Sequence, residues 1–358
     1  MYKQVVRPLL FRLPADSIHE STVTWSSKAS RSPLLRSAAK GIYHYQHPSL
    51  EQKILGLHFR NPVGLAAGFD KNGTLLPIME SLGIGFVEVG SITAEPSSGN
   101  PRPRSFRLKK DCSLINRMGL NNDGAATIMK RLENLKSEIP IGVNIAKTHN
   151  PDIVGEKALE DYRESYRLAK ERADYITVNI SCPNTREGKT FEDPENLNRL
   201  LERITSGEDA TSPPLFVKLS ADLSRSQLKE LIDVCSSHSV NGYVATNTST
   251  VREGLSTPAD TLERIGKGGL SGRAIRAKST DVIRHIFELT NGNRPIIGVG
   301  GIFSAEDALE KIEAGADLIQ VYTGLIYEGP ALIRKINRGL AEYLEKKGLD
   351  HLYQIRSN

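Results

Sequence analysis

Amide, hydroxyl and amine side chains stand at or directly after a series of short β-branched runs in this sequence. An asparagine amide both donates and accepts hydrogen bonds, so a site rich in asparagine suits a neutral, planar ligand with many heteroatoms. Lysines can pair with negative charge there, and because no histidine and carboxylate cluster accompanies them, no metal site is expected. The residues at these positions are Lys71, Ser91, Asn144, Asn179, Cys182, Lys218, Thr246, Asn247, Tyr322 and Thr323.

Two glycine-rich segments, 268–272 and 298–301, add a second kind of chemistry. Backbone N–H groups at such turns, together with the N-terminus of a following helix, form a cradle for phosphate. Either segment alone could be a simple tight turn. Their occurrence together late in the chain predicts that the ligand carries a phosphate group.

The short apolar runs alternate with helical patterns from residue 54 onward, which is the signature of repeated βα units. Their number and the chain length favour a closed (β/α)8 TIM barrel, an α/β fold, over a doubly wound sheet. In such a barrel the residue after each strand points into the active-site mouth. Strands are predicted at 62–66, 85–89, 141–145, 175–180, 215–219, 242–246, 295–299 and 318–321, and helices at 122–136, 155–171, 224–237, 279–289 and 305–314.

Two connections of this barrel, 92–121 and 249–272, are longer than the link between a strand and a helix requires. Long connections at the carboxyl ends of barrel strands usually carry function, because they are free to vary while the scaffold stays fixed. We therefore expect both segments to border the active site.

The first fifty residues differ from the rest of the chain in charge. They hold seven Lys and Arg against two acidic residues, which accounts for the whole net charge of +5. A basic pair of amphipathic helices on a neutral body favours an anionic membrane surface over nucleic acid as partner. The helices of this N-terminal extension are predicted at 14–28, with Ile18, Thr22, Val23 and Trp25 on one side, and at 33–41, with Leu34, Leu35, Ala38, Ala39 and then Ile42 on one side.

The composition, with 39% hydrophobic and 25% charged residues in 358, is that of a folded globular protein. No apolar run approaches the roughly 20 residues that cross a bilayer, and charge interrupts the N-terminus too often for a signal peptide. Three widely spaced cysteines argue for a reducing compartment, and Cys112 and Cys235 are expected to be packing residues. The chain should lie on a membrane or stay soluble.

Six motifs, in order along the chain, resemble those of the dihydroorotate dehydrogenases. The N-terminal extension and the Arg-Met-Gly motif resemble the class 2, quinone-dependent branch of that family. The resemblance implies an N-terminal segment, 1–50, that binds membrane and quinone, and an FMN-binding catalytic barrel, 51–358. The motifs lie at 64–73, 114–122, 178–185, 245–248, 268–272 and 296–301.

The resemblance implies oxidation of (S)-dihydroorotate to orotate in pyrimidine biosynthesis, with hydride passing to FMN and two electrons then passing to a membrane quinone. Lys218 is expected to favour the reduced flavin by its charge. The expected location is the cytoplasmic face of a bacterial inner membrane, with no obligate protein partner. The implied FMN-binding residues are Ala67, Gly68, Ser91, Asn144, Asn179, Lys218, Thr246, Gly272, Gly300, Tyr322 and Thr323.

The resemblance also implies where the other two reactants bind. Lys71 pairs with the negative charge of the substrate, and the amides match its pyrimidine edges and carboxylate. The quinone is expected in a tunnel between the N-terminal helices and the flavin, lined by His19, Arg107 and Tyr322. The implied substrate-binding residues are Lys71, Asn116, Arg117, Met118, Gly119, Leu120, Asn179, Asn184, Asn247 and Thr248.

Cys182 is expected to be the catalytic base that removes the C5 proton, with Lys71 as the second catalytic residue. The class 2 branch typically has Ser where this chain has Cys182 and Phe where it has Leu120, and both residues resemble the soluble class 1 branch. A thiol, with a pKa of about 8.5, loses its proton more easily than a hydroxyl. Half-maximal rate should therefore come at lower pH than in an enzyme that uses Ser.

Alternatives remain open on the sequence alone. A soluble class-1-like dehydrogenase that reduces fumarate or NAD is favoured by Cys182 and Leu120 but opposed by the basic N-terminal helices. A flavin barrel acting on RNA uridines would need a basic barrel face, whereas the barrel region is neutral. A lyase could use Lys218 or Lys71 as a Schiff-base amine on a phosphate-bearing ligand. A non-catalytic binding barrel would not need so complete a set of charged and amide groups.

Overall fold

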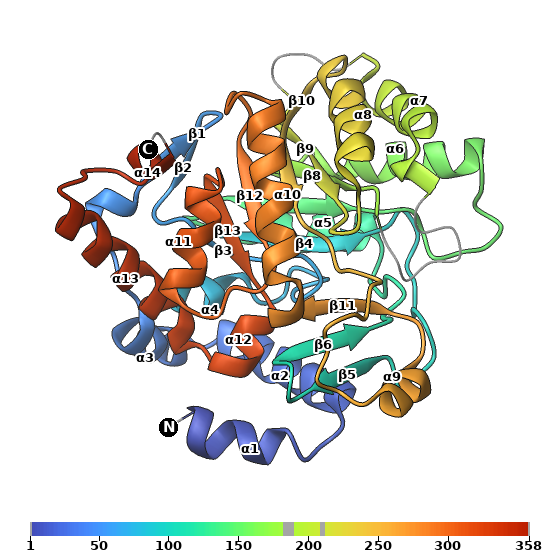
Figure 1. Ribbon diagram of the computed structural model, residues 1–358. Helices are drawn as coiled ribbons and strands as arrows, with labels where there is room; N and C mark the ends of the chain where they lie inside the picture. Colours follow the sequence, from blue (N-terminus) through green and yellow to red (C-terminus); the bar gives the residue numbers. More distant parts are fainter. Residues whose placement is uncertain (1, 182–189, 208–211, 357–358) are drawn as a thin grey trace.

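The computed structural model describes residues 2–181, 190–207 and 212–356. Its centre is a closed barrel of eight parallel strands, joined in the order β10-β12-β13-β3-β4-β7-β8-β9 (Figure 1). The predicted barrel is confirmed, and each of the eight predicted strands is present. The strands are β3 (Val63–Leu65), β4 (Phe86–Ile92), β7 (Ile141–Ile145), β8 (Tyr175–Asn179), β9 (Leu215–Leu219), β10 (Val240–Ala245), β12 (Ile296–Val299) and β13 (Leu318–Val321).

Alternation along these strands sorts the side chains between two cores. Val87 and Val89 of β4 face the helices and join the main hydrophobic core, whereas Phe86 belongs to a separate cluster with Tyr175 and Phe216 inside the barrel. A Cβ atom at Gly142 of β7 would collide with the ring of Tyr175, so the small residue makes room for the large one. The hairpin β1 (Gln52–Ile54) and β2 (Leu57–Phe59) adds to this inner cluster through its last residue.

An outer ring of helices covers the barrel, and side-chain caps fix several of their starts. Ser224 forms a capping box with Gln227 at the start of α8, and Ser304 caps α11. These caps fix where each strand-to-helix connection ends. The helices of the ring are α4 (Leu76–Ser81), α5 (Ala125–Glu133), α6 (Glu156–Ala169), α7 (Pro194–Thr205), α8 (Arg225–Ser236), α10 (Arg276–Leu289), α11 (Ala305–Glu313), α12 (Thr323–Glu328) and α13 (Ala331–Lys347), with α14 (Tyr353–Arg356) at the end of the described chain.

The two long connections meet in one small antiparallel sheet with the strand order β11-β6-β5. The first connection supplies β5 (Ser105–Leu108) and β6 (Ser113–Asn116), and the second supplies α9 (Ala259–Ile265) and β11 (Gly269–Gly272). The segment 268–272 therefore lies mostly in a strand, although its glycine spacing predicted a turn. This sheet lies over one side of the barrel mouth, beside the N-terminal helices (Figure 1).

The N-terminal segment folds as four helical pieces along one flank of the barrel: a π-helix (Tyr2–Val6), α1 (Arg7–Leu10), α2 (Ala15–Ser30) and α3 (Pro33–Tyr43). The last two match the predicted helices, whereas the first two were not foreseen. Helix α2 packs on α4 and β5, and α3 packs on α4 and α13. Within the described ranges no helix is long and apolar enough to cross a membrane.

The prediction that Ile18, Thr22, Val23 and Trp25 share one side of α2 is only partly correct. Ile18 and Thr22 point toward the barrel and line an inner chamber, but Trp25 is 69% exposed. On α3, Leu34 and Leu35 are 78% and 52% exposed, whereas Ala39 packs against the main core. The segment therefore has an apolar inner side and a separate apolar outer side.

Candidate active site

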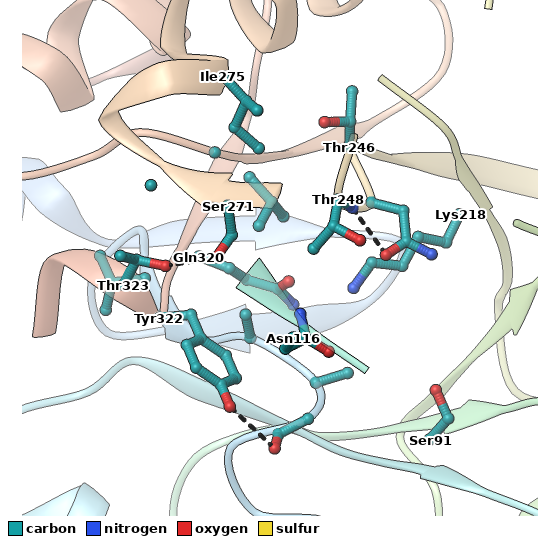
Figure 2. Close-up of a pocket in the computed structure, with 18 of the residues that line it drawn as sticks. Ser91, Asn116, Lys218, Thr246, Thr248, Ser271, Ile275, Gln320, Tyr322 and Thr323 are labelled. Carbon is teal, nitrogen blue, oxygen red and sulfur yellow. Dashed lines mark hydrogen bonds between the residues drawn. The ribbon is translucent and has the colours of Figure 1, made fainter. Parts of the chain in front are cut away.

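A cavity opens at the carboxyl ends of the barrel strands. Its floor is polar, with Lys218 from β9 and Gln320 from β13 reaching up from the barrel interior (Figure 2). Its walls come from the residues that follow the strands and from the small sheet. The predicted residues that line it are Ala67, Gly68, Lys71, Ser91, Asn116, Met118, Gly119, Leu120, Asn179, Lys218, Thr246, Asn247, Thr248, Gly272, Gly300, Tyr322 and Thr323.

Side-chain hydrogen bonds join the asparagines of the cavity. The Asn247 amide donates to Asn179 Oδ1 at 3.1 Å, and the Asn179 amide donates to Ser91 Oγ at 3.1 Å. Ser91 Oγ in turn donates to Asn144 Oδ1. Asn144 is fully buried and does not line the cavity, so it supports Ser91 from below instead of facing a ligand.

Glycines at one side of the cavity bring the main chain close to where a ligand binds. Gly272 has φ of +97°, and a Cβ atom there would lie 2.6 Å from Cys112 O and 2.8 Å from Thr323 Cγ2, so no other residue fits. Gly300 and Gly301 line the same side, and Ser271 Oγ and Thr323 Oγ1 lie 2.9 Å apart. This is a cradle of backbone N–H groups and hydroxyls, which suits phosphate.

Two buried polar atoms test whether the cavity fits a flavin. Thr246 Oγ1 and Gln320 Oε1 are buried and have no hydrogen-bond partner among the residues that the structure describes. Buried polar groups are costly unless they are paired, so a bound molecule that offers hydrogen-bond partners at these two atoms would be favoured. A planar ring with several nitrogen and oxygen atoms next to a phosphate cradle offers such partners.

Lys71 lies at the edge of the cavity that faces the N-terminal helices. Desolvation lowers the pKa of its ammonium to about 7, with a further lowering by Arg104 and an opposite effect of Glu20 and Asp16. Its neighbour Asp70 is buried and accepts hydrogen bonds from the N–H groups of Thr74 and Leu75, which fixes the turn that carries Lys71. A carboxylate in the cavity would restore the charged ammonium.

A second, mostly apolar chamber lies between the N-terminal helices and the barrel mouth. The three residues predicted to bind quinone, His19, Arg107 and Tyr322, line it. Desolvation lowers the pKa of His19 to about 3, so its ring is neutral. The rings of His19, Phe69 and Tyr322 contact edge to face, with centroids 5.9 and 5.3 Å apart. Tyr322 lines both the cavity and the chamber.

Some predicted residues lie away from the cavity or outside the described residues, and the cavity also holds residues that were not predicted. Arg117 does not line the cavity, because its guanidinium lies 4.7 Å from the Phe106 ring centroid and donates to Ile265 O. Cys182 and Asn184 lie outside the described residues. Gln320 and Ser271 line the cavity but were not predicted. The signal for Gln320 was a polar residue inside an otherwise apolar strand.

The described fold and cavity define a class: a TIM barrel whose strand ends enclose an amide-rich cavity that suits a planar, phosphate-bearing ligand. The sequence matches the dihydroorotate dehydrogenase family over residues 49–344. The chain belongs to this family, which is flavin-dependent.

Curated relatives extend the match to nearly the whole chain. A dihydroorotate dehydrogenase (quinone) of Nostoc punctiforme is 44% identical over 368 residues, covering 98% of this chain and 96% of its own. One of Gloeobacter violaceus is also 44% identical, covering 98% and 97%. Among solved structures, the ligand-free DHODH of Eimeria tenella superposes with a TM-score of 0.83 at 33% identity, covering 94% of this chain and 97% of that one.

Proposed function

We propose that this protein oxidises (S)-dihydroorotate to orotate with bound FMN and passes the electrons to a quinone. The observation that carries the proposal is the pair of sites described above. A cavity lined by several amide, hydroxyl and amine side chains and a more apolar chamber share Tyr322, Asn116, Met118 and Ser271 as a common wall. A polar acid and a lipid-soluble quinone need different surroundings, and this arrangement offers both next to one cofactor. The relatives named as quinone enzymes support the same choice of acceptor.

The cavity residues divide between cofactor and substrate. FMN supplies the redox chemistry, because its ring accepts a hydride from one reactant and releases two electrons to another. When FMN is bound, Gly272, Gly300, Tyr322 and Thr323 would hold its phosphate, and Lys218 would contribute a positive charge to its site. The remaining predicted residues that hold the ring and ribityl chain are Ala67, Gly68, Ser91, Asn179 and Thr246, with Asn144 supporting Ser91.

The substrate lies between Lys71 and the amides. Lys71 pairs with its carboxylate, and Asn116, Asn247 and Thr248 bind its polar edges. Cys182 removes the C5 proton, and Asn184, from the same motif at 178–185, also binds the substrate. Of the residues of the Arg-Met-Gly motif, Met118, Gly119 and Leu120 line the cavity, whereas the contacts of Arg117 give it a supporting role.

The N-terminal segment, residues 1–50, holds the quinone and attaches the protein to a membrane surface on the cytoplasmic side. Its inner side forms the chamber with His19 and Arg107, and its outer side exposes Trp25, Leu34 and Leu35 beside its excess of positive charge. Exposed apolar side chains and basic residues on short helices suit the interface of an anionic bilayer. Quinone dissolved in the bilayer could then enter the chamber.

The proposal is tested by a spectrum of the purified protein followed by dihydroorotate turnover with a short-chain quinone, fumarate or NAD as the only acceptor. We expect a yellow protein that turns over fastest with quinone. If fumarate is the preferred acceptor, Cys182 and Leu120 indicate that the protein is a class 1 enzyme. A colourless protein that binds no added FMN would contradict the whole assignment.

A further inference from the structure

One carboxylate lies inside the barrel, below the floor of the cavity. Glu88 of β4 has no exposed surface and does not line the cavity. It accepts hydrogen bonds from the Gln320 amide at 2.7 Å and the Asn144 amide at 2.8 Å. The hydroxyls of Tyr175 and Thr177 each donate to its Oε2 at 3.4 Å. These donors come from four other strand positions, so the barrel is built around this group.

The same carboxylate faces Lys218. Lys218 Nζ lies 3.5 Å from Glu88 Oε1, and the side chain of the lysine is 7% exposed. A buried charge is tolerated when it is paired and hydrogen-bonded, and Glu88 meets both conditions. Because Lys218 reaches the cavity floor, the negative charge below it reduces the positive potential that any ligand above it experiences.

A chain of hydrogen bonds leads from Glu88 to the substrate side of the cavity, and every donor in it points toward Glu88. The Asn144 amide can only donate to a carboxylate, so its carbonyl oxygen must face Ser91, which donates to it. Ser91 Oγ is then left to accept from the Asn179 amide. Asn179 Oδ1 accepts from the Asn247 amide at 3.1 Å and from the Ser181 N–H group at 3.3 Å. The direction of Asn247 is also set by Ser181, whose carbonyl oxygen accepts from the Asn247 amide at 2.8 Å.

We propose that Glu88 is a positioning residue that fixes the direction of the Asn144 amide, and through it the Ser91 hydroxyl that accepts from Asn179, and that it sets the effective charge of Lys218 below the cofactor. A neutral residue at position 88 would offer both a donor and an acceptor, so it would no longer dictate one direction for the chain. This inference rests on the proposed function, since it assigns Glu88 a part in the flavin potential and in orotate binding.

The decisive variant is Glu88→Gln, which keeps the size of the side chain and removes its charge. Without its partner, Lys218 favours the negatively charged reduced cofactor more strongly. We expect the equilibrium for reduction of the bound flavin to shift by at least tenfold toward the reduced form, about 30 mV for a two-electron couple. Orotate should bind at least fivefold more weakly, because the amides are no longer held in one orientation. The readouts are a spectroscopic redox titration and orotate binding.

Two control variants separate this role from a structural one. Glu88→Asp keeps the charge and should return the reduction equilibrium to within threefold of the wild type. Asp161→Asn removes a different buried carboxylate, one that accepts from Thr148 at 2.8 Å in the helix ring, and should leave both readouts unchanged. If the Glu88→Gln protein holds flavin and its flavin reduction equilibrium is not shifted, the proposal is overturned.

If Glu88→Gln does not fold or retain flavin, Ser91→Ala tests the chain. It cuts the chain beyond Asn144 and leaves the pair of Glu88 and Lys218 in place, so we expect orotate to bind at least fivefold more weakly. Unchanged orotate binding would overturn the inference. If dihydroorotate does not reduce the flavin of the wild-type protein, that result would instead contradict the proposed function.

Discussion

The cavity and the chamber share a wall but are held in place by different means. The cavity is lined by residues at the ends of barrel strands, whose registers are fixed by parallel ladders around a closed ring. The outer wall of the chamber is formed by helices that attach to the barrel by side-chain packing and by individual hydrogen bonds, without strand ladders. Among these contacts, Asp16 accepts from Arg104 N at 2.8 Å, and Arg107 donates to Leu10 O at 3.0 Å and Leu13 O at 2.7 Å.

This difference indicates that the two halves of the reaction can be changed separately. A change at the strand ends should act on the oxidation of dihydroorotate, whereas a change in the N-terminal segment should act on the quinone or the membrane. The shared wall, with Tyr322 at its centre, is where the two effects meet. The following variants test this separation, from the largest expected effect to the smallest.

Cys182→Ala should slow reduction of the flavin by dihydroorotate by roughly 10²–10⁴-fold, because it removes the general base. Reoxidation of reduced enzyme by quinone should stay within twofold of the wild type. Stopped-flow absorbance of each half-reaction measures both rates. Near wild-type flavin reduction in this variant would rule out Cys182 as the base.

Replacing Leu34 and Leu35 of α3 together by Ser should weaken binding to anionic vesicles on the order of 10²-fold, because each leucine loses the gain from leaving water. Vesicle sedimentation measures the binding. The matched control is Leu289→Ser on α10, where the side chain is 38% exposed but lies on the barrel. Equal losses in both variants would show that α3 is not the attachment face. Turnover with a short-chain quinone should not change.

Orotate binding should weaken about tenfold per pH unit above pH 7, because the free protein loses the Lys71 proton there and the carboxylate of orotate requires it. Below pH 7 Lys71 is charged in both states, so the affinity should level off. Calorimetry at pH 8 in buffers of different ionisation enthalpy should show proton uptake on binding.

Lys71→Met should abolish this uptake. Lys311→Met should retain it, because Lys311 also has a pKa lowered to about 7 by desolvation but donates to Arg276 O and Thr280 Oγ1, away from the cavity. If both variants lose the proton uptake, the uptake does not come from Lys71.

Tyr2→Phe is expected to have the smallest effect. It removes one hydrogen bond, from the Tyr2 hydroxyl to Ile326 O at 2.7 Å, worth about 1 kcal/mol. The N-terminal segment should therefore open about fivefold more often, as measured by limited proteolysis, while dihydroorotate oxidation stays unchanged. A loss of flavin reduction would show that the two regions are more tightly coupled than their contacts suggest.

The sequence predicted the barrel well because each strand is an apolar run of the right length between turn signals. The strands at 141–145, 215–219 and 318–321 were predicted with the bounds that the structure has. The small sheet was missed, because β11 pairs with β6 across more than 150 residues and no local pattern reports a distant partner. The helical piece before residue 14 was missed for the same reason, since Tyr2 and Arg7 bond to α12.

Most candidate site residues could be predicted because strand ends in a barrel converge on one mouth. Arg117 could not be placed, since its direction depends on Phe106 and on the carbonyl of Ile265 in the other long connection. Glu88 and Gln320 were overlooked because they lie within strands and not after them. A charged residue in the middle of a buried strand was nevertheless a visible signal in the sequence.

The three-stranded sheet joins the two long connections and contributes Asn116 and Ser271 to both compartments. Because this wall is one side chain thick and belongs to the barrel, the N-terminal helices need only enclose the space beyond it. The segment that binds the electron acceptor in such an enzyme can therefore evolve separately from the barrel. A lineage could adopt a new oxidant through changes in its N-terminal helices, while the barrel keeps its ancestral oxidation chemistry.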